Sequence, residues 1–137
     1  MKSKQILLLA SILGALAVIL GAFGAHGLAD KISPEKLETF KLGVSYQYYH
    51  IAALLACGIL SKTGSSERYL GYAAMVFIIG IFCFSGSLYL LSTREISGLG
   101  FLTPILGPMT PIGGLFLIAG WVLMGISVLK TKISNAA

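Results

Sequence analysis

Four long stretches of the chain contain no charged side chain, and they decide how the fold is first interpreted. They cover residues 6–25, 42–60, 69–91 and 112–129. With a rise of about 1.5 Å per residue, helices of roughly 20 residues cross a hydrocarbon layer of about 30 Å. The pattern therefore predicts an all-α integral membrane protein, an antiparallel bundle of four transmembrane helices joined by three links.

Local signals refine where two of these helices begin. Ser33, Pro34 and Glu35 read as an N-cap, a proline in the first turn and an acid at the positive helix end. Thr110 and Pro111 predict the start of the fourth helix in the same way. The link that ends with these two residues, 92–111, is apolar and rich in proline and glycine. We expect it to lie at the membrane interface or to dip slightly into it.

The first stretch has an alternative interpretation as a cleaved signal peptide, because Lys2 and Lys4 precede it and small residues follow it. The apolar region of a signal peptide usually has about 7 to 15 residues. The uncharged stretch 6–25 is longer than that. We therefore expect it to be a retained transmembrane helix.

The composition excludes other classes of protein. Of 137 residues, 56% are hydrophobic and 11% are charged, with a mean hydropathy of +0.89, whereas soluble domains average about 25% charged residues. So few charges cannot cover a soluble surface, and disorder needs the opposite composition. The net charge is +5, but the cations are scattered near the stretch ends, which argues against nucleic-acid binding. We expect one domain, 1–137, embedded in the lipid bilayer.

The cations also predict an orientation. Four spans place both termini and the link 61–68 on one side, which carries Lys2, Lys4, Lys62, Arg68, Lys130 and Lys132. The other side carries Lys31, Lys36, Lys41 and Arg94. The side richer in lysine and arginine normally faces the cytoplasm. Both termini are therefore predicted to be cytoplasmic, with the chain in the cell's inner membrane.

Small residues indicate where helices pack closely, since lipid offers no hydrophobic drive between helices. The first helix has a continuous seam of such residues: Ala10, Gly14, Ala17, Gly21 and Gly24. The seam predicts a contact face, toward another helix of this chain or toward another chain. The third helix has a weaker seam, and the glycines of the fourth form no clean stripe.

The second helix carries a polar cluster. Taken at 100° per residue, one face holds Gly43, Tyr46, Gln47, His50, Ala53 and Cys57, and the other holds Val44, Tyr48, Ile51, Leu55 and Ile59. An imidazole or amide in lipid would lose its hydrogen bonds, so the first face is predicted to point into the bundle and the second to lipid. We expect His50 near mid-membrane, neutral, hydrogen-bonded, and facing the first and fourth helices.

Two interpretations of this cluster stay open. Tyr46, Gln47 and His50, with Trp121 and Ser87 on other helices, form a satisfied structural core or a path for a proton or small polar solute. The indole N–H of Trp121 is predicted to find its partner in the cluster. At the outer end, His26 and Glu38 are further candidates, although a histidine at a helix end has a structural explanation too.

Metal, disulfide and cofactor sites are not expected. His26 and His50 differ in depth by about 15 Å, while zinc needs about four ligands within bonding distance. Cys57 and Cys83 differ in depth by roughly 16 Å, too far for a disulfide. The chain has no Cys-x-x-Cys, P-loop, nucleophile elbow or His-Glu-x-x-His motif.

These observations favour a non-enzymatic membrane module that self-associates as a homo-oligomer or serves as an accessory subunit of a partner membrane protein. The alternative is a carrier or channel for a proton or small polar solute that uses Tyr46, Gln47 and His50. An enzyme acting on a lipid or quinone is less favoured, because the sequence lacks an acid–base pair.

Four sequence blocks resemble the YgdD/YwdK-type family of small membrane proteins, a domain-of-unknown-function family with bacterial members and mitochondrial relatives. The blocks are Gly21-Ala22-Phe23-Gly24-Ala25-His26-Gly27-Leu28, Tyr46-Gln47-Tyr48-Tyr49-His50, Phe84-Ser85-Gly86-Ser87-Leu88-Tyr89, and Thr110-Pro111-Ile112-Gly113-Gly114 with Gly120-Trp121. The resemblance implies a four-span fold in a membrane and no established activity. It also implies a shared core of His26, Tyr46, Gln47, His50, Ser85, Ser87 and Trp121.

Overall fold

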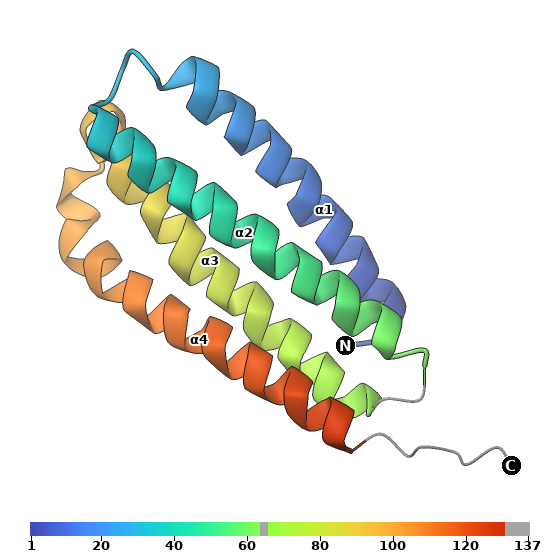
Figure 1. Cartoon of the computed structure of the whole chain (residues 1–137). Coiled ribbons are helices and arrows are strands. Elements are labelled where there is room, and N and C mark those ends of the chain that lie inside the picture. The colour runs from blue at the N-terminus through green and yellow to red at the C-terminus, as the bar shows by residue number, and fades with distance from the viewer. Residues whose placement is uncertain (64–65, 131–137) are drawn as a thin grey trace, which may run out of the picture.

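The computed structural model describes residues 1–63 and 66–130, and these residues are helical apart from short connections (Figure 1). The long helices are α1 (Ser3–Ala22), α2 (Pro34–Leu60), α3 (Glu67–Ser97) and α4 (Thr103–Leu129). A one-turn π-helix, Phe23–Gly27, continues α1, and a short 3₁₀ turn, Gly100–Leu102, precedes α4. The predicted all-α class is thereby confirmed for the described residues.

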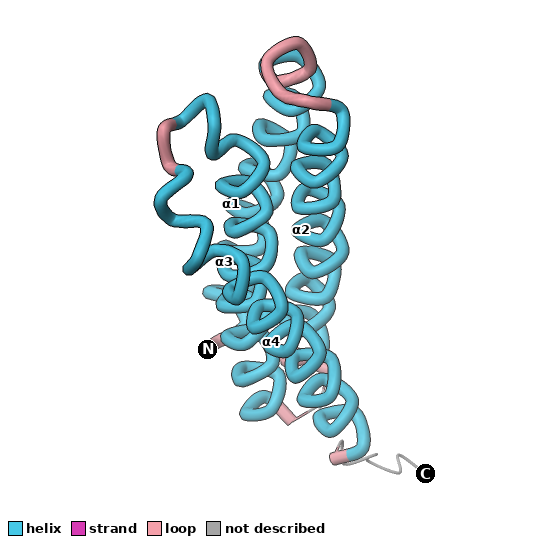
Figure 2. Tube along the Cα trace, turned by 90° about the vertical axis from the view of Figure 1, so that its left-hand side faces the viewer, coloured by secondary structure: helices cyan, strands magenta, loops and turns pink. Residues whose placement is uncertain are grey.

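The four helices lie side by side in chain order, each antiparallel to the one before it (Figures 1 and 2). The extensive interfaces join α1 to α2, α2 to α3 and α3 to α4, and α1 meets α3 only over a short stretch. The hydroxyl of Ser3 donates to the carbonyl of Gly58 at 2.7 Å, which holds the start of α1 beside the end of α2. The arrangement is a curved row with α1 and α4 at its edges.

Three helical segments are long and apolar enough to cross a membrane: Ser3–Gly27, Glu67–Ser97 and Gly100–Leu129. The helix α2 is not among them. Its middle carries three tyrosines, a glutamine and a histidine within residues 46–50, and these lower its hydropathy. Within this stretch Gln47 and His50 are buried in the structure, whereas Tyr48 and Tyr49 are exposed.

The predicted start of α2 is confirmed. The Ser33 hydroxyl accepts a hydrogen bond from the Lys36 backbone N–H at 3.4 Å, and Pro34 occupies the first turn. This bond satisfies one of the N–H groups that a helix start leaves without an intrahelical partner.

The predicted link at 92–111 and the predicted cap at Thr110 are wrong. The helix α3 continues to Ser97 and ends at Gly98, whose φ of 70° closes the helix in a left-handed conformation. The helix α4 already begins at Thr103 and carries Pro108 and Pro111 inside it. Each internal proline removes one helical hydrogen bond and bends the helix. Figure 1 shows the first turns of α4 at an angle to the rest.

The close approach of α3 and α4 depends on glycines of α4. A Cβ on Gly113 would lie 2.4 Å from the Phe84 backbone nitrogen, and one on Gly120 would lie 2.5 Å from the Phe77 ring. Leu117 lies between them and is buried. Residues four and three apart share one helix face, so the fourth helix does have a packing stripe, contrary to the sequence-based expectation.

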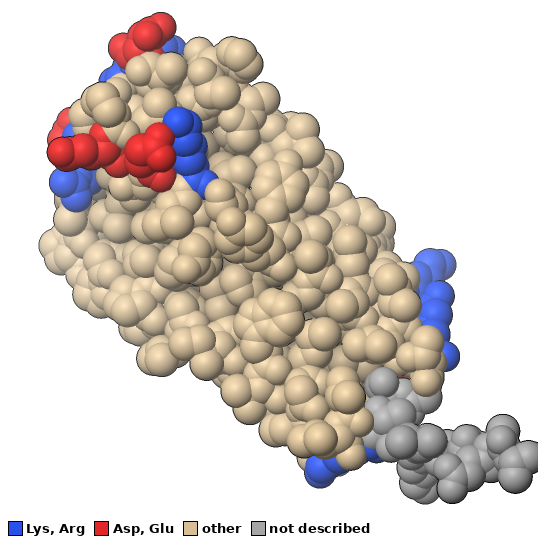
Figure 3. All heavy atoms as spheres, viewed as in Figure 1, with Lys and Arg blue, Asp and Glu red and all other residues tan. Residues whose placement is uncertain are grey.

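Charged side chains lie at the two ends of the molecule and leave the middle uncharged (Figure 3). The end where α1 and α3 begin carries Lys2, Lys4, Lys62, Arg68 and Lys130 with one acid, Glu67. The opposite end carries four cations, Lys31, Lys36, Lys41 and Arg94, and four acids, Asp30, Glu35, Glu38 and Glu95. Lys132 lies outside the described residues. The described cations are therefore balanced at one end and in excess at the other.

Candidate functional site

Gln47 is the centre of the polar cluster and connects three helices. Its side chain is 3% exposed. Its Nε2 donates to the carbonyl of Leu13 in α1 at 2.8 Å, and its Oε1 accepts from the hydroxyl of Tyr89 in α3 at 2.8 Å. The carbonyl of Leu13 faces α2 near the middle of α1, where lipid could offer it no donor. Tyr89 is a member of the site that the sequence analysis did not identify.

His50 is buried and hydrogen-bonded, as its residue type and depth predicted. Its Nδ1 lies 2.7 Å from the carbonyl oxygen of Tyr46. A carbonyl only accepts, so Nδ1 carries the proton and Nε2 of the neutral ring presents a lone pair. The ring lies 5.7 Å from Phe77 of α3 and 6.2 Å from Trp121 of α4, centroid to centroid. It therefore faces α3 and α4, whereas the sequence predicted α1 and α4.

Aromatic rings surround this histidine on the α4 side of α2. Tyr46 stacks on Phe84 with centroids 4.5 Å apart, and Phe77 meets Trp121 edge to face at 5.4 Å. Trp121 is 49% exposed, so it lies at the border of the cluster. The predicted indole hydrogen bond to α2 is absent among the described residues, and its contact with His50 is an edge-on ring contact instead.

The predicted division of α2 into an inward and a lipid-facing side is partly wrong. Val44 and Ile51 are 9% and 7% exposed, although both were assigned to lipid. Tyr48, Leu55 and Ile59 are exposed as predicted. The physical reason is that α2 lies between α1 and α3 and so buries two faces.

Ser87 belongs to the α3–α4 interface. Its hydroxyl is fully buried and lies 2.7 Å from the hydroxyl of Thr110 on α4. Thr110, predicted as a helix cap, is thus a bridging residue between helices. Two residues away, the buried hydroxyl of Ser85 has no hydrogen-bond partner among the described residues.

The small-residue seam of α1 packs against α2 of the same chain over part of its length. Ala10, Ala17 and Gly24 are buried. A Cβ on Gly21 would lie 3.6 Å from Val44, and one on Gly24 would lie 3.0 Å from the Phe40 ring. At Gly14, by contrast, a Cβ would meet nothing within 4 Å.

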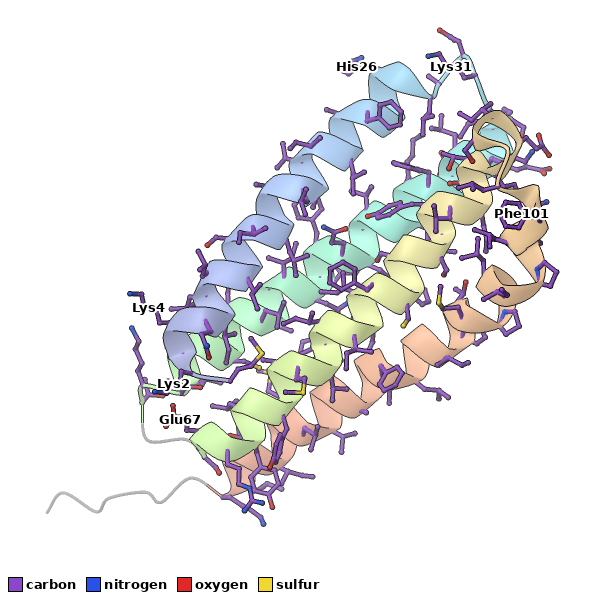
Figure 4. All side chains as sticks on the ribbon, turned by 180° about the vertical axis from the view of Figure 1, so that it is seen from behind. Lys2, Lys4, His26, Lys31, Glu67 and Phe101 are labelled. Atoms are coloured by element: carbon purple, nitrogen blue, oxygen red, sulfur yellow. The ribbon has the colours of Figure 1, made fainter. Side chains whose placement is uncertain are left out.

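His26 and Glu38 do not form a site together. His26 is exposed in the π-helix at the end of α1, where Figure 4 shows it at the opposite end from Lys2. Glu38 is exposed and pairs with Lys41 at 2.7 Å. The placement of His26 in a shared core, which the resemblance implied, is therefore wrong. Within 1–63 and 66–130, no three histidine, cysteine or acidic residues gather as a metal site, and Cys57 and Cys83 are both free.

A cavity of about 150 Å³ reaches Gln47 and Tyr89 from the groove between α1 and α3. Its other lining residues are apolar, including Leu16 and Phe82. His50 does not line this cavity. The cavity that leads to Gln47 and Tyr89 is therefore mostly apolar.

Comparison with known proteins assigns the family. Residues 20–114 match the family described as "Protein of unknown function (DUF423)". The UPF0382 membrane protein SH2409 of Staphylococcus haemolyticus is 42% identical over 123 residues, covering 87% of this chain and 93% of that protein. The UPF0382 membrane protein YwdK of Bacillus subtilis is 39% identical over 127 residues, covering 93% and 98%. A UPF0382 membrane protein of Staphylococcus epidermidis is also 39% identical over 127 residues, covering 93% and 97%.

No solved structure matches the chain. The family model and the relatives agree with each other, and the relatives are covered almost from end to end. The resemblance noted from the four sequence blocks is thereby confirmed. The chain belongs to the DUF423 family of bacterial membrane proteins, whose function is unknown.

Proposed function

We propose that this chain is a four-span, non-enzymatic module of the cell's inner membrane that works by associating with a second copy of itself or with a partner membrane protein. The observation that carries the proposal is the double hydrogen bond of Gln47. Its side-chain nitrogen donates to the Leu13 carbonyl, and its side-chain oxygen accepts from the Tyr89 hydroxyl, so both are hydrogen-bonded within the chain. A buried polar group of the cluster is thus used to hold three helices together.

The direction of the helices supports the four-span arrangement. The helices α1 and α3 begin at the same end, since a Cβ on Gly71 would lie 2.7 Å from the Met1 nitrogen. Two helices that cross a membrane in the same direction need a return crossing between them. The helix α2 runs antiparallel to both and lies between them (Figure 1). The two most polar residues of its polar stretch, Gln47 and His50, are buried and so sheltered from lipid.

The charge distribution supports a cytoplasmic location for both termini. Five described cations and one acid gather where α1 and α3 begin and α4 ends. The other end has as many acids as cations. Cytoplasmic segments of membrane proteins carry the excess of lysine and arginine.

The edge helix α1 offers a surface for association. Part of its seam is occupied by α2, and its opposite side exposes Ser11, Ala15 and Ala22. Small residues let a second helix approach closely and form van der Waals contacts in lipid. This surface is distinct from the interfaces within the chain.

Cysteine cross-linking tests the self-association. In a background with Cys57→Ala and Cys83→Ala, we expect Ala15→Cys to form a cross-linked dimer in native membranes. The matched control is Ala119→Cys, an exposed alanine on the other edge helix, α4. Equal cross-linking of the two would mean random collision. Absence of both, together with co-purification of a single other membrane protein, would leave the accessory role as the form of association.

A carrier for protons or a small polar solute is the second candidate, and His50 favours it. Its Nε2 presents a lone pair at mid-helix beside the half-exposed Trp121, and no described residue donates a hydrogen bond to it. Purified protein in liposomes with an internal pH dye tests this function. Proton uptake that disappears in His50→Leu, while the variant stays folded, would replace the module by the carrier.

A further inference from the structure

The groove between α1 and α3 has a charged end and an apolar end. Where both helices begin, an open cavity of about 400 Å³ is lined by Met1 and Lys2 before α1, by Gln5 of α1, and by Glu67, Arg68 and Tyr72 of α3. Farther along the same two helices lies the apolar cavity of about 150 Å³ at Gln47. The two helices meet only over a short stretch, and Gln47 of α2 lines the apolar cavity between them.

The two cavities open on the same face of each helix. Gln5 and Leu16 line different cavities and are separated by about three turns of α1, so they point in the same direction. Arg68 and Gly86 are separated by five turns of α3 at about 3.6 residues per turn. Met75 and Ile79 fall between them on the same face and are both exposed. These apolar side chains connect the charged cavity to the apolar one.

The charged cavity has the chemistry of an anion site. Arg68 donates from Nε to the Tyr72 hydroxyl at 3.4 Å, which leaves its terminal N–H groups available. Lys2 and the amide of Gln5 add further donors against the single carboxylate of Glu67. Figure 4 shows Lys2, Lys4 and Glu67 at the same end, and Lys4 does not line the cavity. Paired donors from arginine and lysine bind phosphate oxygens strongly.

We infer that this groove binds one anionic phospholipid of the adjoining leaflet, an inference that rests on the membrane placement proposed above. The phosphate lies between Lys2 and Arg68, and one acyl chain runs past Met75 and Ile79 into the cavity beside Gly86. The distance along α1 from Gln5 to Leu16 is about 16 Å, close to half of a hydrocarbon core of about 30 Å. The carboxylate of Glu67 accepts from a hydroxyl of the headgroup.

Native mass spectrometry of the full chain tests whether the charged cavity binds the lipid headgroup. Detergent-purified protein is titrated with dioleoylphosphatidylglycerol or with dioleoylphosphatidylcholine. We expect one phosphatidylglycerol to be retained in preference to phosphatidylcholine. The double variant Lys2→Gln/Arg68→Gln should weaken that binding by about tenfold or more, because each lost partner is a charge-assisted hydrogen bond.

The matched control is Lys4→Gln/Lys62→Gln, which removes the same charge from the same end but outside the cavity. It should retain the lipid as the wild type does. Equal loss in both double variants would overturn the site in favour of a diffuse charge effect. Displacement of the lipid by an excess of glycerol 3-phosphate would also overturn it, since the headgroup alone would then suffice.

Gly86→Leu places a side chain in the apolar cavity and so tests whether the acyl chain lies there. A Cβ at Gly86 meets nothing within 4 Å, and the same is true of Gly125 on α4, so Gly125→Leu is the control. We expect about a tenfold loss of phosphatidylglycerol binding for Gly86→Leu and none for Gly125→Leu. Unchanged binding in Gly86→Leu would overturn the chain placement. Cross-linking at Ala15→Cys is measured separately. It shows whether the proposed association fails while lipid binding persists, or the reverse.

Discussion

The hydroxyl of Tyr89 donates to the side-chain oxygen of Gln47 across the α2–α3 interface, over 2.8 Å and 42 positions of sequence. The same glutamine donates to the backbone of α1 through its nitrogen. One residue of α2 therefore holds both of its neighbouring helices at the depth where lipid would offer no replacement partner. These two bonds link α1, α2 and α3 through a single side chain.

Removing the Tyr89 hydroxyl should destabilise the protein. Tyr89→Phe leaves the buried Oε1 of Gln47 without its donor, and we expect a loss of about 1 kcal/mol in the free energy of unfolding. Gln47→Leu breaks both interhelical bonds and should cost more, about 2 kcal/mol. Unfolding in mixed micelles of increasing SDS fraction measures both. Tyr48→Phe, which changes an exposed tyrosine, is the control, and an equal loss there would contradict the role assigned to Tyr89.

The close approach of α3 and α4 makes Gly113 intolerant of a side chain. A Cβ there would lie 2.4 Å from the Phe84 backbone nitrogen, so the helices must separate to admit it. We expect Gly113→Ala to cost about 1–3 kcal/mol through overpacking. Gly125→Ala, where a Cβ meets nothing within 4 Å, should be neutral or slightly stabilising in the same SDS titration. Two variants of equal stability would show that α4 does not pack on α3 at this glycine.

The helix positions were predictable from sequence because uncharged stretches of about 20 residues are typical of transmembrane helices. The start of α2 was predictable because Ser33 and Pro34 act locally. The start of α4 was not, since the proline- and glycine-rich stretch 92–111 favoured a link, and Thr110 with Pro111 favoured a helix start there. A helix tolerates prolines when its packing compensates the lost bonds, and here Gly113 and Thr110 hold this region against α3.

The candidate site was predictable to a similar extent. The cost of a bare amide or imidazole in hydrocarbon was enough to place Gln47 and His50 inside. It could not identify Tyr89 as the partner, because a tyrosine near a helix end is equally typical of the membrane interface. Nor could it show that α2 lies between two helices, which is what buries Val44 and Ile51.

The proposed orientation predicts which reagents reach the α1–α2 connection. Asp30 is exposed there, at the end with equal numbers of acids and cations. In a background with Cys57→Ala and Cys83→Ala, Asp30→Cys should react with a membrane-impermeant maleimide added outside intact cells. Lys4→Cys at the other end should react only after permeabilisation. The reverse pattern would place both termini outside.

His50 separates the structural from the transport interpretation, and its geometry sets the expected cost of changing it. Its hydrogen-bond acceptor, the Tyr46 carbonyl, lies four residues earlier on the same helix and already receives a helical N–H bond. His50→Leu therefore leaves no buried partner stranded, unlike Gln47→Leu. The ring contacts with Phe77 and Trp121 are lost, and a side chain of similar size replaces them. We expect a loss of at most about 1 kcal/mol, smaller than that of Gln47→Leu in the same SDS titration.

A larger loss than that of Gln47→Leu would mean that Nε2 has a partner in the membrane, such as a second copy of the chain. A well-folded His50→Leu with unchanged proton uptake in liposomes would remove the observation that favours a carrier.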